Sequence, residues 1–134
     1  MLTYLIDDDF ISLYVAEYVL RTENFSADIR LFTTAEAALS SLLADLPTQL
    51  PQVMFLDLNM PVMGGWEFLQ ALEPYAATLQ GRCHIYILTS SLTLADTAKA
   101  QDYPLVKGVL YKPLDAAEVD AIKAQLQSIA SEVP

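Results

Sequence analysis

The feature that most constrains the fold of this chain is the alternation of short apolar runs with longer segments whose apolar residues recur at helical spacing. This alternation is typical of repeated βα units wound around a parallel sheet. A length of 134 residues fits one domain. We therefore expect a single α/β domain over residues 1–134, with no output domain attached.

The expected elements form five βα units. Strands are expected over residues 2–6, 27–32, 53–56, 85–88 and 109–111, and helices over residues 10–21, 35–43, 66–72, 94–101 and 116–129. The third strand is apolar throughout, which is typical of the buried centre of a sheet. The second strand alternates Ile29 and Leu31 with charged residues, which favours an edge strand. Thr34 is a predicted N-cap, and Pro74 is expected to end the third helix.

The charge of the chain argues against several classes of function. Seventeen Asp and Glu residues against seven Lys and Arg residues give a formal net charge of -10, which would repel nucleic acid and anionic lipid. The longest apolar runs are far shorter than the ~20 residues that a membrane span needs. The first residues do not resemble a secretory signal, so a cytoplasmic protein is expected. Cys83 is the single cysteine and has only His84 beside it, which is too few ligands for a disulfide or a zinc site.

Four of the five expected strands are followed at once by side chains that can do chemistry, namely Asp7, Asp8 and Asp9, then Asp57, then Thr89, then Lys112. Ligands of open parallel sheets bind outside the carboxyl ends of the strands, so these side chains are expected in one pocket. Carboxylates packed together repel one another, and a hard divalent cation such as Mg²⁺ or Mn²⁺ would neutralise them. A lysine charge and a threonine hydroxyl beside that cation suit a phosphoryl group, which an aspartate can accept as the nucleophile.

Four segments carry these residues in a fixed order: residues 4–9 (YLIDDD), 55–65 (FLDLNMPVMGG), 87–90 (ILTS) and 112–114 (KPL). Together they resemble the receiver domain of bacterial two-component response regulators, of the single-domain, chemotaxis-regulator type. The resemblance covers nearly the whole chain. It implies a flavodoxin-like, doubly wound (βα)5 fold, with a five-stranded parallel sheet in the order 2-1-3-4-5.

The resemblance also implies how the acidic residues act. Asp57 would accept a phosphoryl group from a sensor histidine kinase or a histidine phosphotransfer protein. Asp8 and Asp57 would bind Mg²⁺ directly, Asp7 would bind it through water, and the backbone carbonyl of Asn59 would be a further ligand. A protein of this kind is a signalling receiver and not an enzyme, apart from catalysing its own phosphorylation and dephosphorylation.

Lys112 and Thr89 would respond to the phosphoryl group. The resemblance implies that Lys112 pairs with it and that the bond from Lys112 to Pro113 is cis. Thr89 would turn inward to hydrogen-bond it, which alters the surface of the fourth expected helix, the fifth strand and the fifth helix. The expected partner is a downstream protein target, with no direct contact to nucleic acid or membrane, and the receiver is expected to be a monomer or a weak dimer.

One position departs from the family pattern. The family usually places Tyr or Phe three residues before the lysine, as part of the switch, and this chain has Val109 there. Tyr111 lies on the same face of the expected strand, and Tyr86 lies on the preceding strand, so either could replace the missing ring. Asn59 and Ser91 occupy the two positions that tune the lifetime of the aspartyl phosphate in the family.

Two other functions stay open. The first is a pseudo-receiver that binds proteins and is never phosphorylated. The second is a phosphohydrolase of the haloacid-dehalogenase type, because Asp7 and Asp9 have its Asp-x-Asp spacing, although Ile11 stands where that class needs Thr or Val.

Some of the polar and aromatic residues have simple structural interpretations. Asp9 could be only an N-cap, and His84 is expected to be exposed. The tyrosines are expected to be half-buried with the hydroxyl outward.

Overall fold

The computed structural model describes residues 1–132, and the side chains of residues 1–129. Its centre is a five-stranded sheet in which every neighbouring pair is parallel. The strands are β1 (Leu2–Ile6), β2 (Asp28–Phe32), β3 (Val53–Leu56), β4 (His84–Thr89) and β5 (Val106–Tyr111). Their order is β2-β1-β3-β4-β5, so the expected doubly wound fold and strand order are confirmed.

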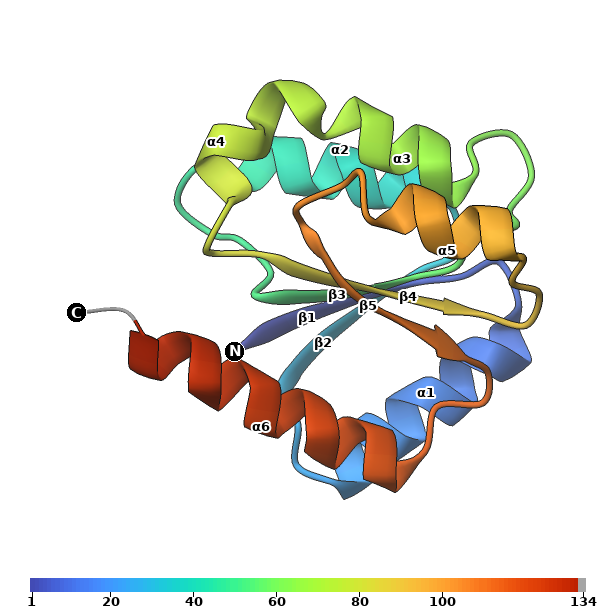
Figure 1. Ribbon diagram of the computed structural model, residues 1–134, viewed down its shortest axis with the longest axis vertical. Helices are drawn as coiled ribbons and strands as arrows, with labels where there is room; N and C mark the ends of the chain where they lie inside the picture. The colour runs from blue at the N-terminus through green and yellow to red at the C-terminus, as the bar shows by residue number, and fades with distance from the viewer. Residues whose placement is uncertain (133–134) are drawn as a thin grey trace.

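The helices cover both faces of the sheet (Figure 1). They are α1 (Phe10–Thr22), α2 (Ala35–Asp45), α3 (Gly65–Ala71), α4 (Ala76–Leu79), α5 (Leu94–Ala100) and α6 (Ala116–Glu132). The helices α1 and α6 contact each other on one face, and α2 packs beside α3 on the other, where α4 and α5 also lie. Pro74 ends α3 as expected and lies within the 3-10 turn Glu73–Tyr75, which the short α4 follows.

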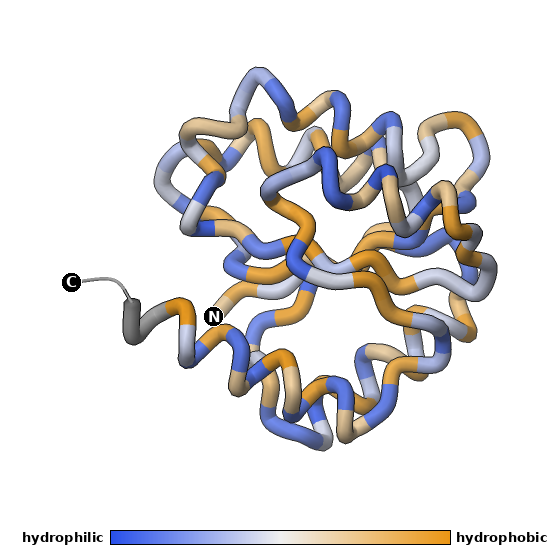
Figure 2. Tube along the Cα trace, viewed as in Figure 1, coloured by the Kyte–Doolittle hydropathy of each residue, from blue (hydrophilic) through white to orange (hydrophobic). Residues whose placement is uncertain are grey.

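The sheet separates two large hydrophobic cores, and residues of β1 and β3 alternate between them. Figure 2 shows the hydrophobic positions along the chain in orange. Tyr4 and Met54 belong to the core under α2 and α3, whereas Leu5 and Phe55 belong to the core under α1 and α6. Because both faces are covered, β1, β3 and β4 are buried along their whole length. The strands β2 and β5 lie at the two edges and are partly exposed.

Two predicted helix starts are confirmed. The Asp9 carboxylate accepts a hydrogen bond from the Ile11 backbone N–H at 2.9 Å, and the Thr34 hydroxyl accepts one from the Ala37 N–H at 3.1 Å. These bonds satisfy backbone donors that the first turn of a helix leaves unpaired. The turn that carries the acidic cluster is thereby joined rigidly to α1.

Several local predictions were wrong. The last strand begins at Val106, three residues before the predicted start, because pairing with β4 extends across Lys107 and Gly108, which interrupt the apolar pattern. His84 is buried, with 8% of its surface exposed, since β4 is an interior strand and helices cover both faces of the sheet. The last helix continues to Glu132, whereas the predicted end was residue 129, and Val133 and Pro134 lie outside the described residues.

The tyrosines also divide differently from the expectation. Tyr4 and Tyr86 are almost fully buried, and their hydroxyls are satisfied inside the protein, by Ser41 at 3.1 Å and by Gln125 at 2.7 Å. A buried hydroxyl with a hydrogen-bond partner costs little free energy, whereas one without a partner is costly.

In the described part of the chain, no helix is both long enough and apolar enough to cross a membrane.

Candidate functional site

Four strands, β1, β3, β4 and β5, carry a polar side chain at or just after their carboxyl ends. These carboxyl ends lie together at one end of the sheet, on the right in Figure 1. Asp7 follows β1, Asp57 follows β3, Thr89 ends β4 and Lys112 follows β5. Asp7, Asp57 and Thr89 are buried, and only 13% of the Lys112 side chain is exposed. Parallel pairing therefore brings together side chains that are up to 105 residues apart in the sequence.

Lys112 is the cation of this site. Its Nζ lies 2.6 Å from Oδ2 of Asp7 and 3.5 Å from Oδ2 of Asp57. Burial acts to lower the pKa of Lys112, but the bond to Asp7 and the charge of Asp57 raise it above its ordinary value. Lys112 is therefore firmly protonated and offsets part of the repulsion between the two carboxylates.

The acidic cluster has the composition of a site for a hard cation. Carboxylate oxygens of Asp7, Asp8 and Asp57 all lie within 4.8 Å of one another, with Asp8 exposed at the mouth. Burial raises the pKa of Asp7 above its ordinary value, and the bond from Lys112 only partly opposes this effect. One lysine does not neutralise three carboxylates, and oxygen ligands of this number and charge fit Mg²⁺ or Mn²⁺. Asp9 points to its helix cap instead and is not in this cluster.

Polar groups of two loops meet beside Asp57. The Asn59 backbone N–H faces Oδ1 of Asp57 at 3.5 Å, and the Asn59 side-chain amide faces the Thr89 hydroxyl at 3.5 Å. The Thr89 hydroxyl donates to the backbone carbonyl of Ser91 at 3.3 Å, so it is engaged by its own loop. Asn59 and Ser91, the two positions at which the resemblance implies tuning of the phosphate lifetime, therefore both contact the Thr89 hydroxyl.

Gly65 allows the loop after β3 to pack tightly. A Cβ atom at this position would lie 2.7 Å from the backbone oxygen of Asp57 and 2.8 Å from Cα of Leu58. Both contacts are with backbone, which cannot move without displacing Asp57. The start of α3 thus presses directly against the end of β3 and holds the buried carboxylate in place.

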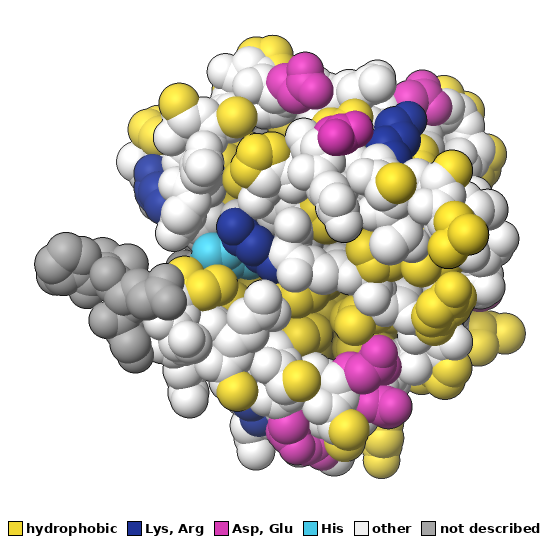
Figure 3. Space-filling model, in the orientation of Figure 1, with side chains coloured by type: hydrophobic (Ala, Val, Ile, Leu, Met, Phe, Trp, Pro, Cys, Tyr) yellow, Lys and Arg dark blue, Asp and Glu magenta, His cyan; other side chains and the backbone are white. Residues whose placement is uncertain are grey.

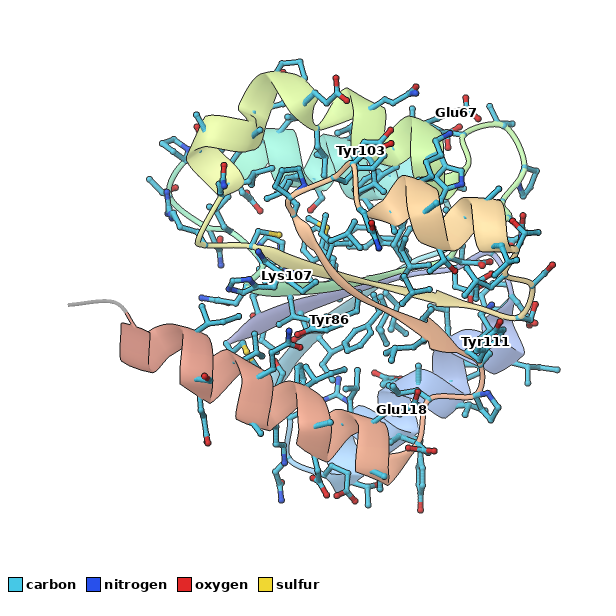
Figure 4. All side chains as sticks on the ribbon, in the orientation of Figure 1. Glu67, Tyr86, Tyr103, Lys107, Tyr111 and Glu118 are labelled. Carbon is cyan, nitrogen blue, oxygen red and sulfur yellow. The ribbon has the colours of Figure 1, made fainter. Side chains whose placement is uncertain are left out.

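The three residues considered for the switch lie in different surroundings. Val109 pairs with Ile87 in the sheet and packs near α5. Tyr111 pairs with Thr89 at the end of β5, and 58% of its surface is exposed (Figure 4). Tyr86 is stacked on Phe55 in the core under α1 and α6. Tyr111 is therefore the aromatic side chain that adjoins Thr89 and also faces solvent.

Two features of the site region were not foreseen from the sequence. One is an exposed row of apolar side chains on the helix that follows the acidic cluster, here named the α1 row: Phe10, Ile11, Tyr14, Val15 and Tyr18. The other is a set of contacts that ties Trp66 of α3 to α5. The indole N–H donates to Asp96 at 3.3 Å, Lys99 lies over the ring at 5.0 Å, and Tyr103 stacks on it. The sequence shows which residues of a helix are apolar and share a face, but not which of them the sheet leaves uncovered.

Comparisons with known proteins give the same class of fold. The family model of the response regulator receiver domain matches residues 3–123. A two-component response regulator from Cytophaga hutchinsonii is 26% identical, with a TM-score of 0.87 over 95% of this chain and 96% of that chain. One from Legionella pneumophila is 26% identical, with a TM-score of 0.77 over 94% of this chain and 97% of that chain. A CheY-like receiver from Methanospirillum hungatei JF-1, 20% identical and with a TM-score of 0.76 over 98% and 97% of the two chains, shares the fold.

No match was found among curated proteins. The fold and the strand order are shared with the CheY-like receiver. Because the family match covers most of the chain, this protein belongs to the response regulator receiver domain family. The resemblance found from the motifs is confirmed, and membership implies interaction with kinases or phosphotransfer proteins.

Proposed function

We propose that this receiver accepts a phosphoryl group on Asp57 in a reaction that depends on a divalent cation. The observation that carries the proposal is the buried Asp57 carboxylate, which lies 3.5 Å from Lys112 and within the cluster of three acids. The donor is the phosphohistidine of a sensor kinase or of a phosphotransfer protein. In the transfer, a carboxylate oxygen of Asp57 forms a bond to phosphorus as the bond from phosphorus to the histidine nitrogen breaks.

Each polar group of the pocket has its own role in this proposal. Asp7, Asp8 and Asp57 would hold Mg²⁺, together with the Asn59 carbonyl. The bound cation supplies charge that neutralises the oxygens of the transferred group. Lys112 already contacts Asp57 and is placed to pair with one phosphoryl oxygen. The backbone N–H of Asn59 lies on the other side of the carboxylate and orients it.

Thr89 is the proposed link from phosphorylation to the surface. Its hydroxyl is held by Ser91 in the free protein, and a phosphoryl group on Asp57 offers a stronger, charged acceptor. Turning toward it would pull the loop that leads into α5, and with it the surface of α5, β5 and α6. Exposed Leu94 and Tyr111 lie on that surface, where a downstream protein would bind.

The α1 row is the proposed contact for the phosphodonor protein. Ile11 is 75% exposed and Tyr18 72% exposed, and the row begins next to Asp9 at the mouth of the pocket. Beside it lies a groove of about 270 Å³, which reaches Lys112 and Pro113. Apolar surface of this extent, continuous with a reactive carboxylate, marks a place for a partner. A donor helix lying there would bring its histidine over Asp57.

The proposal is tested by incubating the protein with acetyl phosphate and following its intact mass. We expect a gain of one phosphoryl group with Mg²⁺ and no gain when EDTA removes the cation. Steady hydrolysis of a phosphate ester without an adduct would favour the hydrolase instead. No reaction in either condition, and none with phosphohistidine donors, would favour the pseudo-receiver.

Replacing Thr89 by alanine is expected to separate phosphorylation from its structural effect. Thr89→Ala keeps Asp57, the three acids and Lys112, so acetyl phosphate should still add one phosphoryl group. The fluorescence of Trp66, the single tryptophan, should change on phosphorylation of the natural protein, because its indole is bound to Asp96 of α5. Thr89→Ala should abolish that change.

The matched control for this experiment is Ser90→Ala, which removes the neighbouring, exposed hydroxyl. Ser90→Ala should keep both the mass gain and the fluorescence change. A full fluorescence change in phosphorylated Thr89→Ala would contradict the proposed role of Thr89.

A charge placed in the α1 row is expected to slow phosphotransfer from a phosphohistidine protein but not from acetyl phosphate. Ile11→Glu should slow transfer from the fastest phosphohistidine protein in a panel by at least about tenfold, because buried interface anchors commonly contribute more than ~1.4 kcal/mol. Labelling by acetyl phosphate should be unchanged. Leu94→Glu, at an even more exposed apolar site on α5, is the control and should leave both reactions unchanged. Equal slowing by both donors would point to damage of the pocket instead.

A further inference from the structure

A second cavity lies at the opposite end of the sheet from Asp57, where β3 and β4 begin. Its volume is about 520 Å³, roughly twice that of the groove beside Lys112. Leu126 and Ile129 of α6 form an apolar wall, and Leu50 lies on the β3 side. The phosphorylation chemistry uses none of these residues, so the cavity is a separate feature.

The charge around this cavity is opposite to that of the whole chain. Although the chain has 17 acidic residues, none of the nine residues that line the cavity is Asp or Glu. Arg82 is the one charged side chain among them, and its guanidinium donates to the Pro47 carbonyl at 3.1 Å. That bond uses one of the five N–H donors of an arginine and leaves the others for a ligand. Lys107 adds a second positive charge close enough to act on His84.

His84 is a buried polar side chain on the cavity wall. Its Nδ1 has no hydrogen-bond partner within the described structure, and neither has the buried hydroxyl of Thr3. The two residues lie in one row of the sheet, on either side of Val53. Buried polar groups without partners are rare and costly, so the surroundings of Nδ1 restrict where the ring can carry its proton. Figure 3 shows the imidazole, in cyan, directly beside a basic side chain.

The imidazole is suited to donate a hydrogen bond. Burial and the charge of Lys107 hold the pKa of His84 below its ordinary value, so the ring is neutral near pH 7. A proton on the enclosed Nδ1 would have no acceptor, which favours the tautomer with its proton on Nε2. Nε2–H is therefore the donor that the ring has available, and His84 is one of the residues that line the cavity.

We propose that this cavity binds a small organic carboxylate with an apolar body. Arg82 would take the carboxylate as a two-pronged donor, His84 would donate to it, and Leu50, Leu126 and Ile129 would cover the apolar part. A planar carboxylate matches the guanidinium fork, and the apolar wall favours an organic anion over an inorganic one. Because α6 forms one wall and also belongs to the proposed output surface, an occupant would hold that helix against the sheet.

The test compares two probes that differ in charge but hardly in shape. Benzoate is titrated into the isotope-labelled protein, and NMR shifts of the His84 ring and of the Leu126 and Ile129 methyl groups are followed. We expect saturable shifts of these signals with benzoate and binding at least about tenfold weaker with benzamide, because a charged hydrogen bond contributes more than ~1.4 kcal/mol. Equal affinity for the two probes, or no shifts at these residues, would overturn the proposal.

A pair of variants locates the charge. Arg82→Gln should weaken benzoate binding at least about tenfold, whereas Arg21→Gln, an exposed arginine paired with Glu17 on α1, should leave it unchanged. Both variants should still be phosphorylated by acetyl phosphate. Benzoate should also bind Asp57→Asn with unchanged affinity. This variant therefore tests the cavity proposal independently of the phosphorylation proposal. Shifts confined to Lys112 and its neighbours would show an anion at the other end of the sheet and would refute this site.

Discussion

Asp57→Asn is expected to abolish covalent phosphorylation by acetyl phosphate and by phosphohistidine proteins. An amide has the shape of the carboxylate but is too weak a nucleophile to attack phosphorus. Intact mass spectrometry with excess Mg²⁺ should show no added phosphoryl group, against near-complete labelling of the natural protein. Folding should survive, because the change removes one of the repelling carboxylates that share Lys112.

The control for this prediction is Asp9→Asn, which alters the neighbouring acid that caps α1. Asp9→Asn should cost at most ~1 kcal/mol of stability, since Asn is also a good cap, and should keep the full mass gain. Phosphorylation that persisted in Asp57→Asn would move the phosphoacceptor to another residue and would contradict the proposed function.

Lys112→Met is expected to make the stability of the protein depend on a divalent cation. Removing the ammonium leaves Asp7 and Asp57 buried without their cation, and breaking a buried ion pair typically costs about 3 kcal/mol. In EDTA, the free energy of unfolding measured with urea should fall by about that amount. Mg²⁺ should restore much of it, because a ligand at 100 times its Kd stabilises the folded state by ~2.7 kcal/mol.

Lys107→Met provides the matched control, since Lys107 is an exposed lysine of the same strand. Its stability should change by less than ~0.5 kcal/mol in either condition. If Lys112→Met were as stable as the natural protein in EDTA, the lysine would not be the residue that neutralises the two acids.

Much of the pocket was predictable because it depends on strand ends. Apolar runs predict strands, alternation with helices predicts that they are parallel, and parallel strands bring their carboxyl ends to one edge. Asp57, Thr89 and Lys112 could therefore be placed together before their distances were known. The N-caps at Asp9 and Thr34 were predictable for a similar reason, since a cap depends on a few adjacent residues.

Other features depend on contacts between distant parts of the chain. The sequence does not indicate that Lys112 lies nearer to Asp7 than to Asp57, because these distances depend on how strands far apart in the sequence are placed in the sheet. The early start of β5 comes from pairing with β4, and the burial of His84 comes from the helices that cover the faces of the sheet. No local pattern in the sequence indicates these features.

The sequence by itself thus determined the class of fold, the strand ends and the chemistry that gathers there, because periodicity and residue type are local properties. Tertiary packing alone decided which apolar residues of α1 remain uncovered, and it enclosed His84 next to the cavity under α6. The physical reason is that burial is shared between elements. A helix or strand encodes an apolar face, but only the neighbours packed against it determine how much of that face is covered.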